Sequence, residues 1–133
     1  GTFYTISSLV QDSARLFFTR TGANDPKFNL RHEPAWIIRE KGKNRTFVNV
    51  IEIHGNYSAI TEISSNSYPS VKQIKLLQND EELSVVEINT GGKRILIAQT
   101  NKDFDPNKKH SFKRDQVQID WTGPYTIKHI NQN

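Results

Sequence analysis

Three arginines in the first third of the chain, Arg20, Arg31 and Arg39, carry a side chain suited to holding a carboxylate. A guanidinium group can donate two parallel hydrogen bonds to one carboxylate. These arginines belong to a basic stretch, residues 13–45, with eight basic and three acidic side chains, a net charge of +5, whereas the whole chain carries +4. The positive charge is therefore local and indicates a surface that meets an anion. The alternative is salt bridging to glutamates across strands: Glu33, Glu40 or Glu52.

A second candidate lies in Glu52-Ile53-His54-Gly55, at the end of a strand-like run over 46–54. Side chains two residues apart share one face of a strand, so the Glu52 carboxylate could orient or charge the His54 imidazole. The competing interpretation is a hydrogen-bonded histidine that stabilises the turn at Gly55. We favour this second interpretation.

The rest of the chain offers no recognisable catalytic motif. The four histidines, at positions 32, 54, 110 and 129, are scattered, and no cysteine is present, so we expect neither a metal site nor a cofactor. No phosphate-binding, dinucleotide-binding or hydrolase motif occurs, and the basic residues are not interleaved with aromatics as in a nucleic-acid groove. We recognise no signal peptide and no membrane-spanning run, and we expect the chain to be an excised fragment.

The elements that must position these residues are strands. Alternating apolar and polar residues separated by turn-forming sequences predict an all-β fold, an antiparallel β-sandwich of about nine strands in a single domain, residues 1–133. The Gly91-Gly92 pair predicts a tight hairpin. We interpret 56–70 as a polar loop or an irregular edge, and 101–114 as a polar and basic stretch with a turn at Asp105-Pro106-Asn107. The predicted strands are 2–6, 13–21, 35–39, 46–54, 71–77, 83–89, 93–100, 117–121 and 125–130.

Aromatic residues divide between core and surface in this scheme. The apolar positions of the first two long strands are predicted to be core: Ala14, Leu16, Phe18, Trp36 and Ile38. Trp121, beside the Gly123-Pro124 turn, is expected to be more exposed, and with Tyr57 it could stack on sugar rings.

The segment RTGANDPKFNLRHEPAWIIRE, followed by FVNVIEIHGNY, resembles the C-terminal β-domain of heparinase II/III-type polysaccharide lyases, most closely their oligoalginate lyase branch. The matching block covers residues 14–57, about a third of the chain. Such enzymes join an N-terminal (α/α) toroid to antiparallel β-sheets and cleave uronate-containing polysaccharides by β-elimination. A group that neutralises the carboxylate makes the C5 proton acidic, and a Tyr or His removes it.

The resemblance implies an accessory domain of a bacterial lyase, of alginate or heparin type, that packs on the catalytic toroid and β-sheet domains and is inactive alone. The catalytic residues of the family lie mostly outside the matching block, so none is assigned here. The resemblance suggests binding of an acidic polysaccharide by residues that match the pattern of the family: Arg20, Asn24, Asn29, Arg31 and His54. It also implies a periplasmic or secreted location. The alternative is an autonomous carbohydrate-binding module for acidic glycans, which would use Trp121 or Tyr57 with Arg20 and Arg31.

Overall fold

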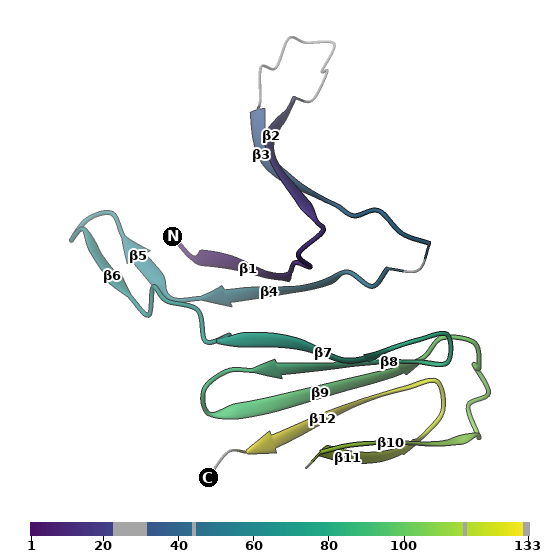
Figure 1. Cartoon of the computed structure of the whole chain (residues 1–133). Coiled ribbons are helices and arrows are strands. Elements are labelled where there is room, and N and C mark those ends of the chain that lie inside the picture. Colours follow the sequence, from purple (N-terminus) through teal and green to yellow (C-terminus); the bar gives the residue numbers. More distant parts are fainter. Residues whose placement is uncertain (23–31, 44, 116, 132–133) are drawn as a thin grey trace. The chain divides into compact units, whose positions relative to one another are not determined.

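The computed structural model describes residues 1–22, 32–43, 45–115 and 117–131 (Figure 1). These residues form an all-β structure in which every strand pair is antiparallel, consistent with the predicted β-sandwich. Within them there is no helix that could span a membrane. The predicted fold class is therefore confirmed.

Twelve strands are present in the described part of the chain. Their bounds are β1 Phe3–Leu9, β2 Arg15–Gly22, β3 His32–Arg39, β4 Val48–His54, β5 Asn56–Ser58, β6 Ile63–Ser65, β7 Gln73–Asn79, β8 Leu83–Asn89, β9 Lys93–Thr100, β10 Lys109–Arg114, β11 Val117–Thr122 and β12 Tyr125–Asn131.

Nine of the twelve strands overlap the predicted ones. The other three lie in 56–70, interpreted as a loop or an irregular edge, and in 101–114, where no strand is predicted. β5 and β6 form a short hairpin, and β10 pairs with β11. Their sequences are polar, so no apolar alternation marks β5, β6 or most of β10. Their backbones form strands because a neighbouring strand satisfies their hydrogen bonds, which is a non-local effect.

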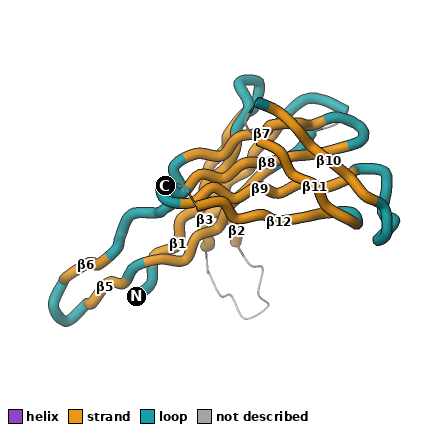
Figure 2. Tube along the Cα trace, turned by 90° about the horizontal axis from the view of Figure 1, so that it is seen from below, coloured by secondary structure: helices purple, strands orange, loops and turns teal. Residues whose placement is uncertain are grey.

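The chain divides into two compact units, residues 1–9 with 48–133, and residues 10–47. The larger unit contains a four-stranded sheet in the order β12-β9-β8-β7, whose strands lie side by side in both ribbon views (Figures 1 and 2). It also contains the β1–β4, β5–β6 and β10–β11 pairs. The predicted hairpin at Gly91-Gly92 joins β8 to β9, and Thr90 N donates to Lys93 O at 3.0 Å.

The hydrophobic core of this larger unit lies between the four-stranded sheet and the β10–β11 pair. β11 supplies every second residue to it, so its buried and exposed positions alternate. Trp121 is one of the inward residues and is only 8% exposed, so the expectation of an exposed Trp121 is wrong. The residue follows the two-residue period of its strand, which outweighs its nearness to a turn. The buried cluster consists of Val85, Leu96, Ala98, Phe112, Val117, Ile119 and Trp121.

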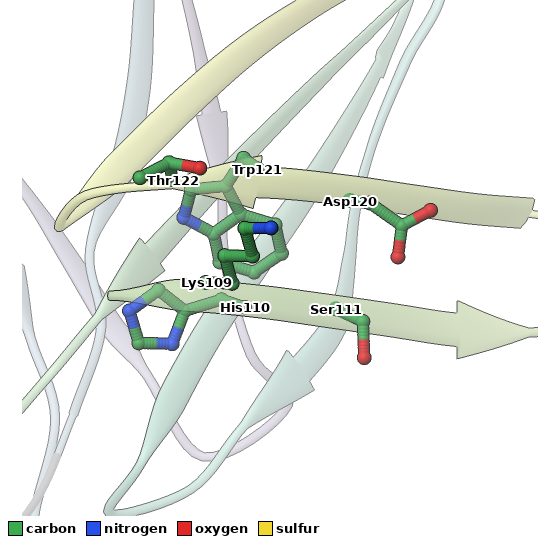
Figure 3. A pocket seen from close by; sticks show the side chains of 6 residues that line it. All are labelled: Lys109, His110, Ser111, Asp120, Trp121 and Thr122. Carbon is green, nitrogen blue, oxygen red and sulfur yellow. The ribbon is translucent and has the colours of Figure 1, made fainter. Parts of the chain in front are cut away.

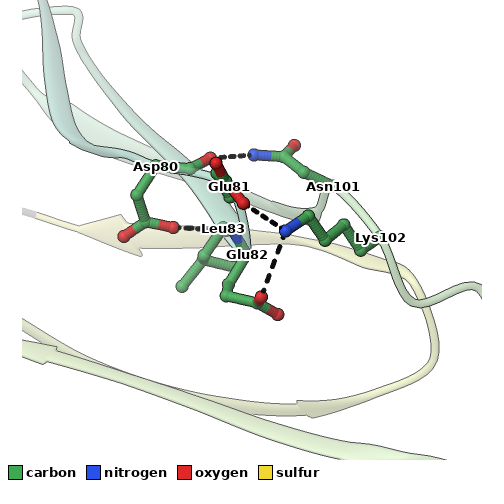
Figure 4. A network of polar contacts seen from close by, with 6 residues as sticks. All are labelled: Asp80, Glu81, Glu82, Leu83, Asn101 and Lys102. Atoms are coloured by element: carbon green, nitrogen blue, oxygen red, sulfur yellow. Dashed lines mark hydrogen bonds and ion pairs between the residues drawn. The ribbon is translucent and has the colours of Figure 1, made fainter.

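The turn between β7 and β8 is closed by side chains (Figure 4). Asp80 Oδ1 accepts hydrogen bonds from Glu82 N and Leu83 N, both at 2.8 Å, and Asn101 Nδ2 donates to Asp80 O at 2.7 Å. The bond from Leu83 N is the largest of the effects that lower the pKa of Asp80. Lys102 forms ion pairs with Glu81 and Glu82. This acidic turn stabilises the β7–β8 hairpin, because its carboxylates form hydrogen bonds and ion pairs with nearby residues.

The smaller unit is built on the β2–β3 hairpin, and it corrects the predicted core. In register, Leu16 faces Ile38 and Phe18 faces Trp36, so the apolar residues do share a face. However, Leu16, Phe18 and Trp36 are 47%, 78% and 40% exposed. Alternation placed these residues on one face, but the opposite face carries the exposed pair Phe17 and Ile37, and two strands alone lack enough structure to bury either face.

Candidate functional site

Two of the five predicted binding residues lie in the described part of the chain. Arg20 is an exposed residue of β2, opposite Pro34. His54 ends β4. They belong to different compact units. The remaining three residues, Asn24, Asn29 and Arg31, lie outside the described residues. The five-residue binding surface therefore stays a prediction.

His54 is held by hydrogen bonds on both ring nitrogens. Nδ1 lies 2.9 Å from the carbonyl oxygen of Asn66, and Nε2 lies 2.8 Å from Thr5 Oγ1. A carbonyl oxygen can only accept, so Nδ1 donates to Asn66 O, whereas the Thr5 hydroxyl can either donate to Nε2 or accept from it. Phe3 stacks on the imidazole with ring centroids 6.0 Å apart. His54 thus has the hydrogen-bonded environment of the turn-stabilising interpretation.

Gly55 allows this arrangement because the β5–β6 hairpin approaches it closely. Its φ of 60° lies in the left-handed region. A Cβ at this position would lie 2.3 Å from the carbonyl oxygen of Asn66, the group that accepts from His54. Glycine therefore satisfies both the backbone conformation and the close approach.

Glu52 lies on the same face of β4 as His54, as the sequence predicts, but its carboxylate holds a different segment. It accepts from Ser70 N at 2.7 and 3.0 Å and from Val71 N at 3.2 Å. The hydrogen bond from Ser70 N is the main cause that lowers the pKa of Glu52 below its ordinary value of 4.5, with a smaller contribution from the charge of His54. Glu52 therefore fastens the start of the 70–71 segment to β4 as a carboxylate.

Replacing Glu52 with Gln is expected to lower the free energy of unfolding by about 1–2 kcal/mol above pH 5, because the side-chain amide is a weaker acceptor for these donors. A lowered pKa contributes stability above the unfolded value, and this contribution disappears as the pH falls through the folded value. The difference between the two proteins should therefore shrink below about pH 4.5. Urea denaturation across a pH series measures it.

Glu62→Gln is the matched control, since Glu62 is exposed and no hydrogen bond or ion pair is seen for it in the part of the chain that the structure describes. A pH-independent difference between wild type and Glu52→Gln would contradict the assigned role of the Glu52 carboxylate.

A second group of polar residues surrounds an open pocket of about 420 Å³ on the β10–β11 pair (Figure 3). His110 and Trp121 face each other in register and their rings stack at 5.4 Å. Nε2 of His110 and Nε1 of Trp121 are buried and have no hydrogen-bond partner among the residues that the structure describes. Because both nitrogens are shielded, the groups open to a ligand are those on the outward face. Lining residues are Lys109, His110, Ser111, Asp120, Trp121 and Thr122.

The third feature is a pocket of about 310 Å³ within the smaller unit, lined by Ser13, Arg15, Arg39 and Lys41. We call it the cationic notch. Three of its four lining side chains are cationic, and none of the described residues that line it is acidic. Arg39 was one of the three arginines proposed to hold a carboxylate. Arg15 and Lys41 were recognised only as part of the basic stretch. The position of Arg15 opposite Arg39 depends on strand register.

None of these features is a catalytic constellation. The described residues contain no group of three or more His, Cys, Asp or Glu side chains placed to hold a metal ion. The tyrosines, which could act as bases in an elimination, are exposed at separate positions: Tyr4, Tyr57, Tyr68 and Tyr125. The described residues include side chains that stabilise the fold or could bind a ligand. No catalytic residue was assigned from the sequence.

Comparison with known proteins places the chain near alginate lyases. No family model matches it. An exo-oligoalginate lyase of Saccharophagus degradans is 30% identical over 120 residues, which are 89% of this chain and 16% of that protein. An alginate lyase of Stenotrophomonas maltophilia is 31% identical over 127 residues, 94% of this chain and 17% of that protein. The chain is thus a distant homologue of alginate lyases, and it spans about a sixth of the length of these curated relatives.

Proposed function

We propose that the chain is an accessory C-terminal β-domain of a polysaccharide lyase that degrades uronate-containing polysaccharide by β-elimination. The observation that carries this proposal is the uneven coverage of the homology. Nearly the whole chain matches two alginate lyases, yet it accounts for only 16% and 17% of their lengths. A segment of this size is one part of such a protein, so most of the catalytic apparatus would lie in the remaining sequence.

The exposed apolar surface of the chain supports a packing role. On the outer face of the β1–β4 pair, Tyr4 lies opposite Ile53 and Ile6 opposite Ile51. These four side chains are 67%, 65%, 41% and 65% exposed, respectively. A contiguous apolar group of this kind is typical of a surface that is covered by another structure. We propose that the covering structure is the rest of the same parent chain.

The resemblance to heparinase II/III-type lyases suggests what that remainder contains. We propose an N-terminal (α/α) toroid and a β-sheet domain that hold the catalytic residues and the acidic polysaccharide. The parent protein would then act in the periplasm or outside the cell, where such polymers are met. No cofactor is assigned to the chain itself.

The alternative function is an autonomous module that binds acidic glycans. The cationic notch favours it, since the described residues that line the notch include three cationic side chains and no carboxylate. The burial of Trp121 removes the proposed stacking platform, although Tyr57 remains 39% exposed. A module would act through charge more than through aromatic stacking.

The accessory-domain proposal predicts that the 133-residue chain alone forms no unsaturated uronate from alginate, because a β-elimination needs a base beside a neutralised carboxylate. Ultraviolet absorbance of the unsaturated product measures this, with a full-length alginate lyase as the positive control. Turnover by the chain alone would overturn the proposal.

Deleting the 133-residue segment from the parent protein distinguishes the accessory-domain proposal from the binding-module alternative. An accessory packing domain leaves a remainder that unfolds at lower temperature and loses activity on short and long substrates alike. A binding module leaves a stable remainder that keeps its activity on short oligosaccharides and loses it selectively on the polymer.

A further inference from the structure

The cationic notch brings positively charged side chains close together, an arrangement that is unfavourable on paired strands. Arg15 and Arg39 are direct cross-strand partners in the β2–β3 hairpin, and the notch opens between them and the neighbouring Ser13 and Lys41. Like charges directly opposite each other on paired strands repel. Among the described residues, neither arginine side chain has an ion pair or a hydrogen bond. The hairpin therefore carries an electrostatic cost that a bound anion would relieve.

The acidic residue nearest in sequence does not relieve this repulsion. The Glu40 side chain is only 2% exposed and lies 3.7 Å from Arg45 Nε, and it does not line the notch. Arg45 in turn donates to the carbonyl oxygen of Lys41 at 3.2 and 2.9 Å and to Gln11 Oε1 at 3.2 Å. These contacts fix the backbone at Lys41 and leave its ammonium group available. The hydrogen bonds of Arg45 thus fix the backbone on the Lys41 side of the notch without involving the charged groups that line the notch.

We propose that the cationic notch binds the carboxylate of an acidic sugar. Two guanidinium groups can each present paired donors to carboxylate oxygens, while the ammonium of Lys41 and the hydroxyl of Ser13 can serve a remaining oxygen or a sugar hydroxyl. The choice of a uronate as the source of the carboxylate rests on the proposed function. The notch shares no residue with the set predicted from the sequence, Arg20, Asn24, Asn29, Arg31 and His54.

The test is calorimetric titration of the 133-residue chain with a saturated uronate oligosaccharide at low ionic strength, where exposed charges are least screened. The double variant Arg15→Gln/Arg39→Gln is expected to bind about tenfold more weakly or worse, because charge-assisted hydrogen bonds from two arginines are lost. The control Lys75→Gln/Lys113→Gln removes the same charge from exposed positions outside the notch and should change the affinity by no more than about twofold. A neutral oligosaccharide of the same length should not bind.

A second variant separates folding from binding. Arg15→Lys/Arg39→Lys keeps the charge and removes the paired donors, so its affinity should fall while its far-ultraviolet circular dichroism is unchanged. The glutamine variant should keep or raise the melting temperature, since it removes a repulsive pair. Unchanged affinity in both variants overturns the proposal, and so does equal or tighter binding of an oligoglutamate peptide of the same charge, which would identify an acidic peptide as the ligand.

The outcome is independent of the test of the proposed function. Loss of uronate binding in the notch variants can be observed whether or not residues 1–133 stabilise a larger protein. Failure of the notch proposal leaves the effect of deleting the domain unchanged, and the reverse also holds.

Discussion

Replacing Gly55 with Ala is expected to lower the free energy of unfolding by about 3 kcal/mol or more. The left-handed conformation at φ 60° disfavours any side chain by roughly 1–2 kcal/mol. The added Cβ would also lie 2.3 Å from Asn66 O and 2.5 Å from Ser65 O, which are backbone atoms and cannot rotate away. The β5–β6 hairpin would have to move, and the hydrogen bond from His54 to Asn66 would lengthen. Urea denaturation followed by circular dichroism measures the loss.

Gly92→Ala is the matched control, since a Cβ there meets nothing within 4 Å and the residue has no positive φ. Its expected effect is within about 0.5 kcal/mol of wild type. Similar losses in the two variants would contradict the close approach at Gly55. A selective loss at Gly55 would show that His54 is held by the neighbouring hairpin, which bears directly on its predicted binding role.

Replacing Leu96 with Ala is expected to lower the free energy of unfolding by about 2–5 kcal/mol. Leu96 is fully buried, at 0% exposure, in the cluster shared by the four-stranded sheet and the β10–β11 pair. The substitution removes apolar contacts from both sides of that core and leaves a cavity, because close-packed neighbours collapse only in part. Thermal and urea denaturation of the full chain measure the effect.

Ile127→Ala provides the comparison for Leu96, because Ile127 lies on β12 of the same sheet but is 54% exposed. A loss of less than about 1 kcal/mol is expected there. If the two substitutions cost the same, the cluster around Leu96 is not the main source of stability of the larger unit.

The two experiments also bear on how the chain functions. The buried cluster around Leu96 and the close backbone approach at Gly55 both lie in the larger unit, whereas the cationic notch lies in the smaller one. Variants of the notch can therefore test binding without removing the contacts that hold the larger unit together. This separation makes charge variants in the β2–β3 hairpin informative about ligands.

Sequence reasoning located nine of the strands and the hairpin at Gly91-Gly92 because each depends on local pattern. The alternation in β11 and the Gly91-Gly92 turn are examples, since neighbouring residues alone determine them. It missed β5, β6 and β10, whose polar sequences become strands through pairing with a partner. It also misplaced Trp121, because nearness to a turn is a weaker guide to exposure than the face of the strand on which the residue lies.

The candidate sites also divide into features that the local sequence predicts and features that only the structure shows. Sequence placed Glu52 and His54 on one face and recognised Arg39 as a carboxylate-binding candidate. Only the structure showed that Glu52 and His54 hold two different segments, Ser70–Val71 and Asn66. Hydrogen-bond partners of this kind are 12–19 positions apart in the chain, so no spacing rule predicts them.

The sequence by itself determined the all-β class, the positions of most strands and the local excess of positive charge, since these follow from side-chain period, turn chemistry and composition. The tertiary structure decided which apolar face is buried, what His54 contacts and which cations meet. Those outcomes depend on strand register and on the packing of sheets. Arg15 and Arg39 are 24 residues apart in sequence and become neighbours only when β2 pairs with β3.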